Sequence, residues 1–442
     1  MMPARTILLL ILCVILARRA SSDEQMICSR PRFWNTTFTS VSNKTKLIVV
    51  LGSSTAAGVG ASNPAAAWVS LLTASVAKDG FRVRNSSISG STTSDSIARF
   101  GSDVVAYRPD FVLLATSLWN EDFADAPVDA GDRYLTNTRM LVNMVRSIGS
   151  LPVVIGPYPN TLSSPVHVQT IKSIYKEMET FGVPIVDCWN ASSDPSGRWL
   201  PGLSVDGTHP TDLGHRVLYD AFPTSLFSAA YGYYQDSADT EAGAFFSSGE
   251  QNIAVALEQP TGSWSAGVWE KECGSGLGDV LSVISDSGKL NVVRSRNSFD
   301  ITLDDTAVFS APVLHTQPSW RHIVLTYNGQ TGSVSLYLAG RLRGAAGLGR
   351  ALNARRVMIR GCQNCELSDF VIYRSPLALD DVSNLARCVV LRKSLEFWAK
   401  LDQPFPYGFF NSAHTSTLGN ATPGWLFDAD STVHCCERRL RL

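Results

Sequence analysis

The pattern of apolar and polar residues changes near residue 235 and divides the chain into two parts. Before that point, short apolar runs alternate with segments in which apolar residues recur with helical period. The apolar runs are Lys46–Leu51, Phe81–Arg84, Asp110–Ala115, Leu151–Ile155 and Val183–Val186. The helical segments include Trp68–Lys78, Tyr134–Ile148 and Val168–Phe181. Such runs are typical of strands buried on both faces of a parallel sheet, and their alternation with helices predicts a doubly wound α/β domain.

After residue 235 the apolar residues recur at every second position, in short runs broken by Gly, Asn, Asp and Ser. The runs are Ile253–Leu257, Val280–Ile284, Leu290–Val293, Trp320–Tyr327, Val334–Leu338 and Arg356–Ile359. Short alternating runs with such breaks predict an all-β sandwich. We therefore expect the α/β domain in residues 23–235, the sandwich in 236–390 and a cysteine-containing tail in 391–442.

Residues 1–22 have the layout of a cleaved signal peptide. Arg5 precedes the apolar run Ile7–Ala17, and the small residues Ala20, Ser21 and Ser22 follow. The run is too short to cross about 30 Å of hydrocarbon as a helix. The sequence therefore predicts export, with a mature chain that is secreted or resides in the lumen of the secretory pathway and has no membrane span.

Composition narrows the choice of partners. Of 442 residues 17% are charged and the formal net charge is −1, so there is no basic surface of the kind that binds nucleic acid.

Cys13 leaves with the signal peptide, and the remaining eight of the nine cysteines favour disulfides whose pairing the sequence does not determine. The Cys362 and Cys365 pair has no second pair at matching spacing, so we expect no zinc site there. We also expect no other metal and no cofactor. Glycosylation sequons stand at Asn35, Asn43, Asn85, Asn190 and Asn420.

Polar residues follow the predicted parallel strands, at the edge where doubly wound sheets bind ligands. Ser54 comes after Gly52, Gly90 lies in a serine- and threonine-rich loop, and Asn120 follows the third strand. Asp206 and His209 stand three residues apart before a helical segment, a spacing that lets the carboxylate hold the imidazole. Taken singly, each loop is better explained as an ordinary turn or cap.

In this order, however, the loops resemble the four motif blocks of the SGNH/GDSL hydrolases, over about Lys46 to Phe227. The resemblance implies that Ser54 is the nucleophile, His209 the base and Asp206 its orienting carboxylate. It also implies an oxyanion hole made by the backbone N–H groups of Ser54 and Gly90 and by the Asn120 amide. His167 and His215 are the competing bases.

Two positions depart from that family's pattern. Ser53 stands where the first block has Asp, and Leu118 stands where the third block has Gly. Because a Leu does not readily adopt the positive φ open to Gly, we expect a differently shaped oxyanion hole. Trp119 is a candidate to line the pocket.

The second part of the chain, about Ala242 to Leu385, resembles the laminin-G/concanavalin-like jelly rolls. The resemblance rests on Trp320–Tyr327, Gly332–Gly340 and Leu367–Tyr373. Such domains bind sugars or proteins, or only pack against a neighbour, so the fold alone does not define a ligand.

Together these resemblances imply a secreted serine esterase or deacylase that cleaves an oxygen ester through an acyl-Ser54 intermediate. The expected substrate is a small ester or an acylated glycan, and the sandwich is a possible site for a glycan or glycoprotein ligand. Two alternatives stay open: a binding protein whose SGNH domain is a catalytically weak scaffold, and an acyltransferase.

Overall fold

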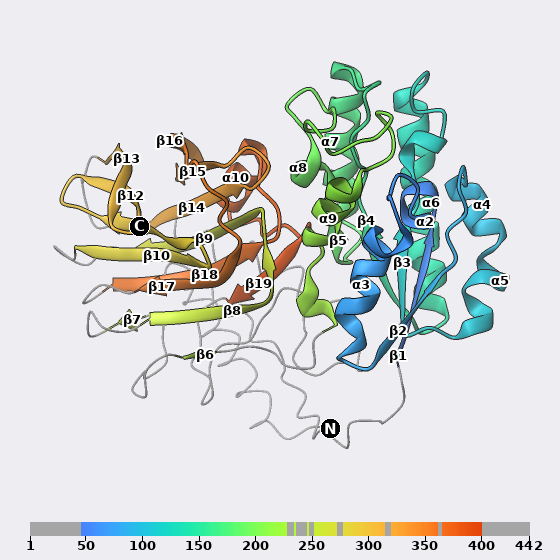
Figure 1. Cartoon of the computed structure of the whole chain (residues 1–442), viewed down its shortest axis with the longest axis horizontal. Helices are drawn as coiled ribbons and strands as arrows, with labels where there is room; N and C mark the ends of the chain where they lie inside the picture. The colour runs from blue at the N-terminus through green and yellow to red at the C-terminus, as the bar shows by residue number, and fades with distance from the viewer. Residues whose placement is uncertain are drawn as a thin grey trace, which may run out of the picture.

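The computed structural model describes residues 46–227, 234–235, 245–246, 252–271, 277–313, 320–360 and 365–399. The expected signal peptide and the sequons at Asn35, Asn43 and Asn420 lie outside these residues. Figure 1 shows the α/β domain on the right and the β-sandwich on the left. Within the described ranges, no helix combines the length and the apolar character needed to span a bilayer.

A five-stranded parallel sheet forms the centre of the α/β domain, in the order β2-β1-β3-β4-β5. The strands are β1 (Lys46–Gly52), β2 (Phe81–Asn85), β3 (Phe111–Ala115), β4 (Leu151–Ile155) and β5 (Ile185–Val186). Alternate residues of β1 enter the cores on the two faces of the sheet: Val50 packs on one face and Leu51 on the other. Burial on both faces explains the continuous apolar runs.

Helices cover both faces of this sheet. Packing residues of α3 and α9 share a core with Val50, and those of α6 and α7 share the core on the opposite face. The helices of the domain are α2 (Ser54–Ala57), α3 (Trp68–Ala77), α4 (Thr93–Ala98), α5 (Phe100–Asp103), α6 (Pro127–Ser147), α7 (Pro165–Glu179), α8 (Cys188–Ser192) and α9 (Asp212–Asp220). The loops at the carboxyl ends of the strands therefore lie between two helical layers.

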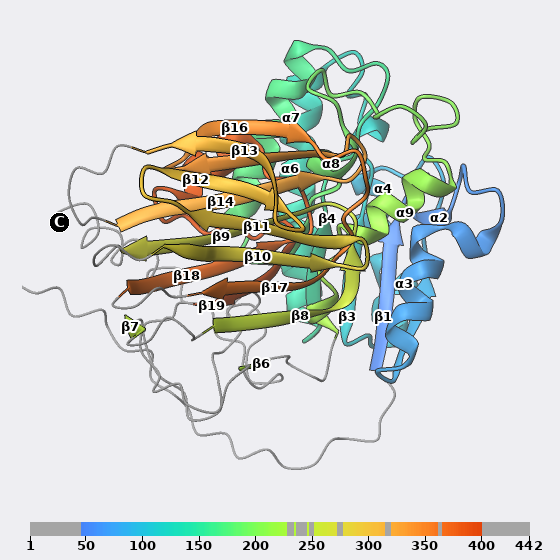
Figure 2. The same cartoon turned by 60° about the vertical axis from the view of Figure 1, so that its left-hand side comes forward.

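Two antiparallel sheets form the second domain, in the orders β13-β12-β11-β10-β17-β8-β6 and β16-β15-β14-β9-β18-β19, with β7 beside β18. Trp264, Phe299 and Tyr327 are among the large side chains buried between the sheets; Figure 2 shows the sheets stacked face to face. The strands are β6 (Tyr234–Gln235), β7 (Phe245–Phe246), β8 (Asn252–Thr261), β9 (Trp264–Lys271), β10 (Gly278–Ser285), β11 (Gly288–Arg294), β12 (Ser298–Leu303), β13 (Thr306–Pro312), β14 (Trp320–Asn328), β15 (Ser333–Leu338), β16 (Arg341–Gly347), β17 (Ala354–Arg360), β18 (Cys365–Tyr373) and β19 (Leu395–Ala399), with one helix, α10 (Leu379–Leu385).

The predicted fold class, a parallel α/β domain followed by an all-β sandwich, is confirmed by this arrangement. The more specific likeness to laminin-G and concanavalin-like jelly rolls stays a prediction. Strand β19 pairs with β18 although it lies beyond residue 390, where we expected the sandwich to end. The aromatic residues Phe397 and Trp398 belong to this strand and are buried, so this part of the expected tail is integral to the fold.

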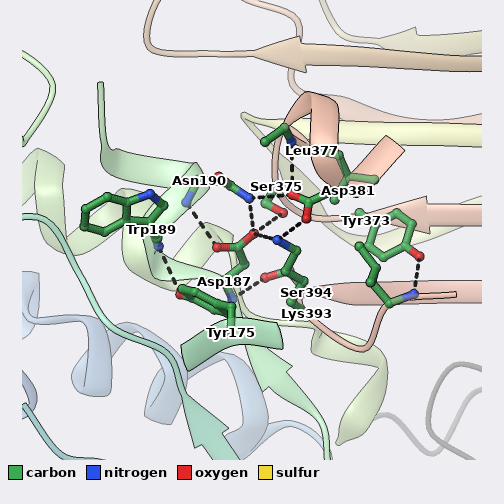
Figure 3. A network of polar contacts seen from close by, with 12 residues as sticks. Tyr175, Asp187, Trp189, Asn190, Tyr373, Ser375, Leu377, Asp381, Lys393 and Ser394 are labelled. Carbon is green, nitrogen blue, oxygen red and sulfur yellow. Dashed lines mark hydrogen bonds and ion pairs between the residues drawn. The ribbon is translucent and has the colours of Figure 1, made fainter. Parts of the chain in front are cut away.

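The segment before β19 also completes the α/β domain. Lys393 pairs in parallel with Ile185 of β5, and the Ser394 N–H donates to the Ile185 carbonyl at 2.6 Å. Lys393 reaches Asp187 on one side and Asp381 on the other, as Figure 3 shows. The two domains therefore share one hydrogen-bonded edge with buried charges.

Candidate active site

Ser54 lies at the first turn after β1, where the chain passes directly into helix α2. Gly52 makes this turn possible, because a Cβ at this position would come within 2.6 Å of the Ala115 carbonyl oxygen on β3. The Ser54 side chain is almost buried, with 8% of the residue exposed. Ser53, at the position of the expected Asp, is fully buried, and its hydroxyl makes no hydrogen bond within the described part of the chain.

The structure brings Ser54, His209 and Asp206 together in one chain of contacts. His209 Nε2 lies 3.1 Å from Ser54 Oγ, and His209 Nδ1 lies 2.7 Å from Asp206 Oδ2. Because an ionised carboxylate only accepts hydrogen bonds, Nδ1 carries the proton and a neutral imidazole leaves Nε2 free to accept from the Ser54 hydroxyl.

Asp206 is held in its ionised form. Burial raises its pKa, but the hydrogen bond with the His209 side chain and those from the backbone N–H groups of His209 and Thr208 outweigh burial and lower the pKa to about 2. The two N–H groups lie 2.7 and 2.8 Å from Asp206 Oδ1. Asp206 is therefore a fixed negative charge beside the imidazole.

Neighbouring residues hold the turn that carries Asp206 and His209. Ser204 Oγ accepts from the Gly207 N–H at 2.8 Å and donates to the His209 carbonyl at 2.9 Å. Gly207 has a φ of +86°, and a Cβ there would collide with the Thr161 side chain, so only glycine fits. Ser204 was not predicted from the sequence; its nearness to Asp206 was the only available signal.

Two of the three expected oxyanion residues, Gly90 and Asn120, lie in loops that contact each other. Gly90 has a φ of +78°, and no atom lies within 4 Å of where its Cβ would be. Asn120 Nδ2 donates to the Ser91 carbonyl at 2.9 Å, so its amide is fixed against the loop that carries Gly90. One Nδ2 hydrogen is used in this contact, and no other hydrogen bond from Nδ2 is seen within the described residues.

Leu118 fits this loop without strain. It lies in the short 3-10 helix Leu118–Asn120, is buried, and is absent from the residues with positive φ; the left-handed position is instead Asp122, with a φ of +61°. Asp tolerates this conformation better than a branched residue would. Trp119 donates from Nε1 to the Tyr158 carbonyl at 3.0 Å and packs against Phe123.

The two competing histidines have structural partners. His215 is fully buried and lies between the Trp68 N–H and the Val59 carbonyl, 3.4 and 3.2 Å from its ring nitrogens, and burial lowers its pKa. His167 lies between Ser164 and the Phe123 carbonyl. Of the three histidines, His209 is the one with a nitrogen on Ser54.

A small cavity lies behind the nucleophile turn. Its lining includes Thr55, Thr116, Tyr158 and Cys188. Cys188 is a buried free thiol, and burial raises its pKa strongly. In the described ranges, no group of three or more His, Cys, Asp or Glu side chains is arranged to hold a metal ion.

One sequon is engaged in the domain interface. Asn190 Nδ2 donates to Asp187 Oδ2 at 2.8 Å and to Asp381 Oδ2 at 3.0 Å, which uses both amide hydrogens. A glycan on Asn190 would replace one of them. Asn85, by contrast, is exposed and uses one amide hydrogen, toward the Ala56 carbonyl.

The first half of the chain is similar to known hydrolases. Residues 50–217 match the model of the GDSL-like Lipase/Acylhydrolase family. An acetylxylan esterase from Geobacillus stearothermophilus is 28% identical over 169 residues, which are 35% of this chain and 76% of that protein. These two matches support a GDSL-type hydrolase domain in the first half of the chain, and more narrowly an esterase-type hydrolase.

Two solved structures each match 40% of this chain. A lipase/acylhydrolase from Enterococcus faecalis is 20% identical, with a TM-score of 0.34, and the match covers 40% of this chain and 92% of that one. A catalytic mutant of an acetylxylan esterase from Geobacillus stearothermophilus is also 20% identical, with a TM-score of 0.32 and coverage of 40% and 91%.

Proposed function

We propose that this protein is a secreted serine esterase that hydrolyses an oxygen ester through an acyl-Ser54 intermediate. The observation that carries the proposal is the continuous contact from Ser54 Oγ through His209 to Asp206. This is the arrangement in which a neutral imidazole activates a serine hydroxyl and an ionised carboxylate stabilises the resulting imidazolium.

In the first half of the reaction Ser54 Oγ forms a bond to the ester carbonyl carbon while its proton passes to His209 Nε2. The carbonyl oxygen becomes an oxyanion beside the N–H groups of Ser54 and Gly90 and the Asn120 amide. When the bond to the leaving alcohol breaks, His209 gives its proton to that alcohol oxygen. Donors fixed before the reaction stabilise the oxyanion most effectively.

In the second half a water molecule loses a proton to His209 and its oxygen bonds to the acyl carbon. The bond to Ser54 Oγ then breaks, and Ser54 takes the proton back from His209. The products are a carboxylic acid and an alcohol, and no cofactor takes part.

A short acyl group on a carbohydrate hydroxyl is the proposed substrate. Support comes from the acetylxylan esterase that resembles residues of this domain. The proposed extracellular location rests on the N-terminal layout of Arg5 and the apolar run Ile7–Ala17. The sandwich would hold the enzyme on a glycan or glycoprotein.

The test is activity of the full-length protein from a secretory host, with p-nitrophenyl acetate and acetylated xylan as substrates and a fluorophosphonate as probe. We expect the probe to label Ser54, and Ser54→Ala to lower kcat by at least about 10³-fold. Ser53→Ala is the matched control, one position away and also buried, and should keep most of the activity.

The opposite pattern, activity lost in Ser53→Ala and kept in Ser54→Ala, would refute the assigned nucleophile. An unlabelled, inactive wild type that binds sugars on a glycan array would instead identify a binding protein. Acetyl groups appearing on an added sugar rather than as free acetate would identify an acyltransferase.

A further inference from the structure

The residue after Asn120 makes a second contact with the loop that carries Gly90. We propose that Glu121 is a positioning residue for the oxyanion hole, and that Asn120 and Glu121 together hold the oxyanion loop, Ser89–Thr93, at two points. This inference rests on the proposed function, because it concerns the same site.

The two contacts lie on either side of Thr92. Asn120 Nδ2 donates to the Ser91 carbonyl at 2.9 Å, and Glu121 Oε1 accepts from the Thr93 N–H at 2.6 Å. Glu121 is only 5% exposed, so the contact of its carboxyl group with the loop is shielded from solvent. A buried hydrogen bond of this kind is costly to lose, because the N–H left behind has no water to replace the carboxyl oxygen.

The main chain of Glu121 is itself anchored. Arg133 on α6 donates from Nη2 to the Glu121 carbonyl at 2.6 Å. The left-handed Asp122 then turns the chain away, and the N–H groups of Asp125 and Ala126 both donate to its carbonyl. Glu121 therefore approaches the loop from a fixed backbone rather than from a free surface segment.

The oxyanion loop needs such external support. No neighbouring side chain or backbone atom packs where a Cβ of Gly90 would lie. Packing at Gly90 itself therefore does not fix the orientation of its N–H. On the other side of Gly90, the Ser91 N–H donates to the Ile88 carbonyl and the Ile88 N–H to the Gly52 carbonyl. Gly90 thus lies between a tether to the nucleophile strand and the two contacts from Asn120 and Glu121.

The position of an oxyanion donor matters at the scale of about 1 Å. Removing such a donor typically costs about 10²- to 10³-fold in kcat, and a shift of about 1 Å in a reacting group can cost about 10²-fold. A residue that only positions the donor should therefore affect kcat less than the donor does, and should affect KM little.

The experiment compares Glu121→Ala, Glu121→Gln and Asn137→Ala in the full-length protein with p-nitrophenyl acetate. Asn137 is the matched control, because it also contacts Thr93, but at the side chain and not at the backbone N–H. Asn137 Nδ2 donates to Thr93 Oγ1 at 2.9 Å. We expect Glu121→Ala to lower kcat about 10- to 100-fold with KM changed by less than about threefold. Glu121→Gln keeps an acceptor oxygen and should recover most of kcat, and Asn137→Ala should stay within about twofold of wild type.

Three results would overturn the inference in an active wild-type background: kcat of folded Glu121→Ala within about twofold of wild type, a rise in KM alone, or a Gln variant as poor as the Ala variant. If Glu121→Ala does not fold, Glu121→Asp replaces it, since the shorter side chain keeps the charge but not the reach to Thr93. A folded Glu121→Asp with unchanged kcat overturns the inference equally. An inactive wild type that the fluorophosphonate does not label is a failure of the proposed function instead.

Discussion

Asp206 and Asp187 each make the same pair of hydrogen bonds to the residue three positions later, but Asp206 lies near solvent and Asp187 in the interior. Asp206 binds the N–H and the side chain of His209, and Asp187 binds the N–H and the side-chain amide of Asn190, at 3.1 and 2.8 Å. The Asp206 side chain is 50% exposed, whereas that of Asp187 is fully buried. The pKa of Asp206 falls to about 2, while burial raises the pKa of Asp187 although Lys393 opposes the shift.

The difference teaches what such a turn needs in order to do chemistry. Beyond His209 lies Ser54 Oγ. Beyond Asn190 lies Asp381 of the other domain, and Lys393 sits between the two carboxyl groups. One turn orients a base, and the other joins two domains.

The largest expected effect concerns the orienting carboxylate. Asp206→Asn should lower kcat by about 10²- to 10⁴-fold, because an amide facing Nδ1 allows the tautomer in which Nε2 carries the proton and cannot accept one from Ser54. Ester hydrolysis kinetics measure it. Asp194→Asn is the control, since Asp194 also caps an exposed turn, through the N–H groups of Ser196 and Arg198, without facing a histidine. A kcat within tenfold of wild type for Asp206→Asn would mean that the two turns do not differ in the way described.

The second prediction concerns the buried turn. Lys393→Ala leaves Asp187 and Asp381 facing each other without their cation and should cost about 3–5 kcal/mol of unfolding free energy. Lys172→Ala is the matched variant, because Lys172 also pairs across the domains, with Asp380 at 3.3 Å, but both side chains are at least half exposed. That pair should be worth about 0–1 kcal/mol. Urea unfolding measures both, and equal losses would contradict the distinction between buried and exposed pairs.

The third prediction is that pH changes the free energy of unfolding in opposite directions through Glu179, which contacts the Lys393 segment, and through Asp206. Burial raises the pKa of Glu179 to about 7, although the Arg392 N–H and the charges of Lys393 and Arg392 oppose it. The folded protein therefore keeps this proton where the unfolded chain has lost it, and stability falls as pH rises from the ordinary range of a glutamate through about 7. Asp206 has a lowered pKa, so its contribution is present at neutral pH and is lost as pH falls toward 2.

The test is the difference in unfolding free energy between wild type and Glu179→Gln at pH 4 and pH 8. We expect the wild type to lose up to about 3 kcal/mol relative to the variant over this range, and subtracting the variant cancels the other titrating groups. A difference that stays constant to about 0.5 kcal/mol would show that Glu179 keeps the same proton in both states.

Local pattern was enough to predict most elements of the α/β domain but not their beginnings. Helices α6 and α7 start at Pro127 and Pro165, several residues before the apolar periodicity is visible. Proline at the first helical position is a start signal that we did not use. The strand expected over Val183–Val186 is reduced to Ile185–Val186, because Pro184 has no N–H to donate.

The candidate site was predictable where its residues are close in sequence. The three-residue spacing of Asp206 and His209 shows their contact directly, and the order of the loops suggested Ser54. The contact of Glu121 with Thr93 and that of Lys393 with Asp187 have no local pattern, since each depends on how separate segments dock. The roles of the site residues stay predictions until the variants are measured.

The pairing of Ser394 with Ile185 and Asp187 has a consequence for biosynthesis. Asp187 and Ser394 are separated by 207 residues in the chain, so at about 5–20 residues per second the ribosome needs about 10 to 40 seconds to deliver the segment that closes the edge of β5. During this interval the edge of β5 in the nascent α/β domain is unpaired, and the Asp187 carboxyl group lacks the cation that pairs with it in the complete fold. A premature stop anywhere between the two domains would leave every proposed catalytic residue in place and yet withhold the segment on which the edge of their sheet depends.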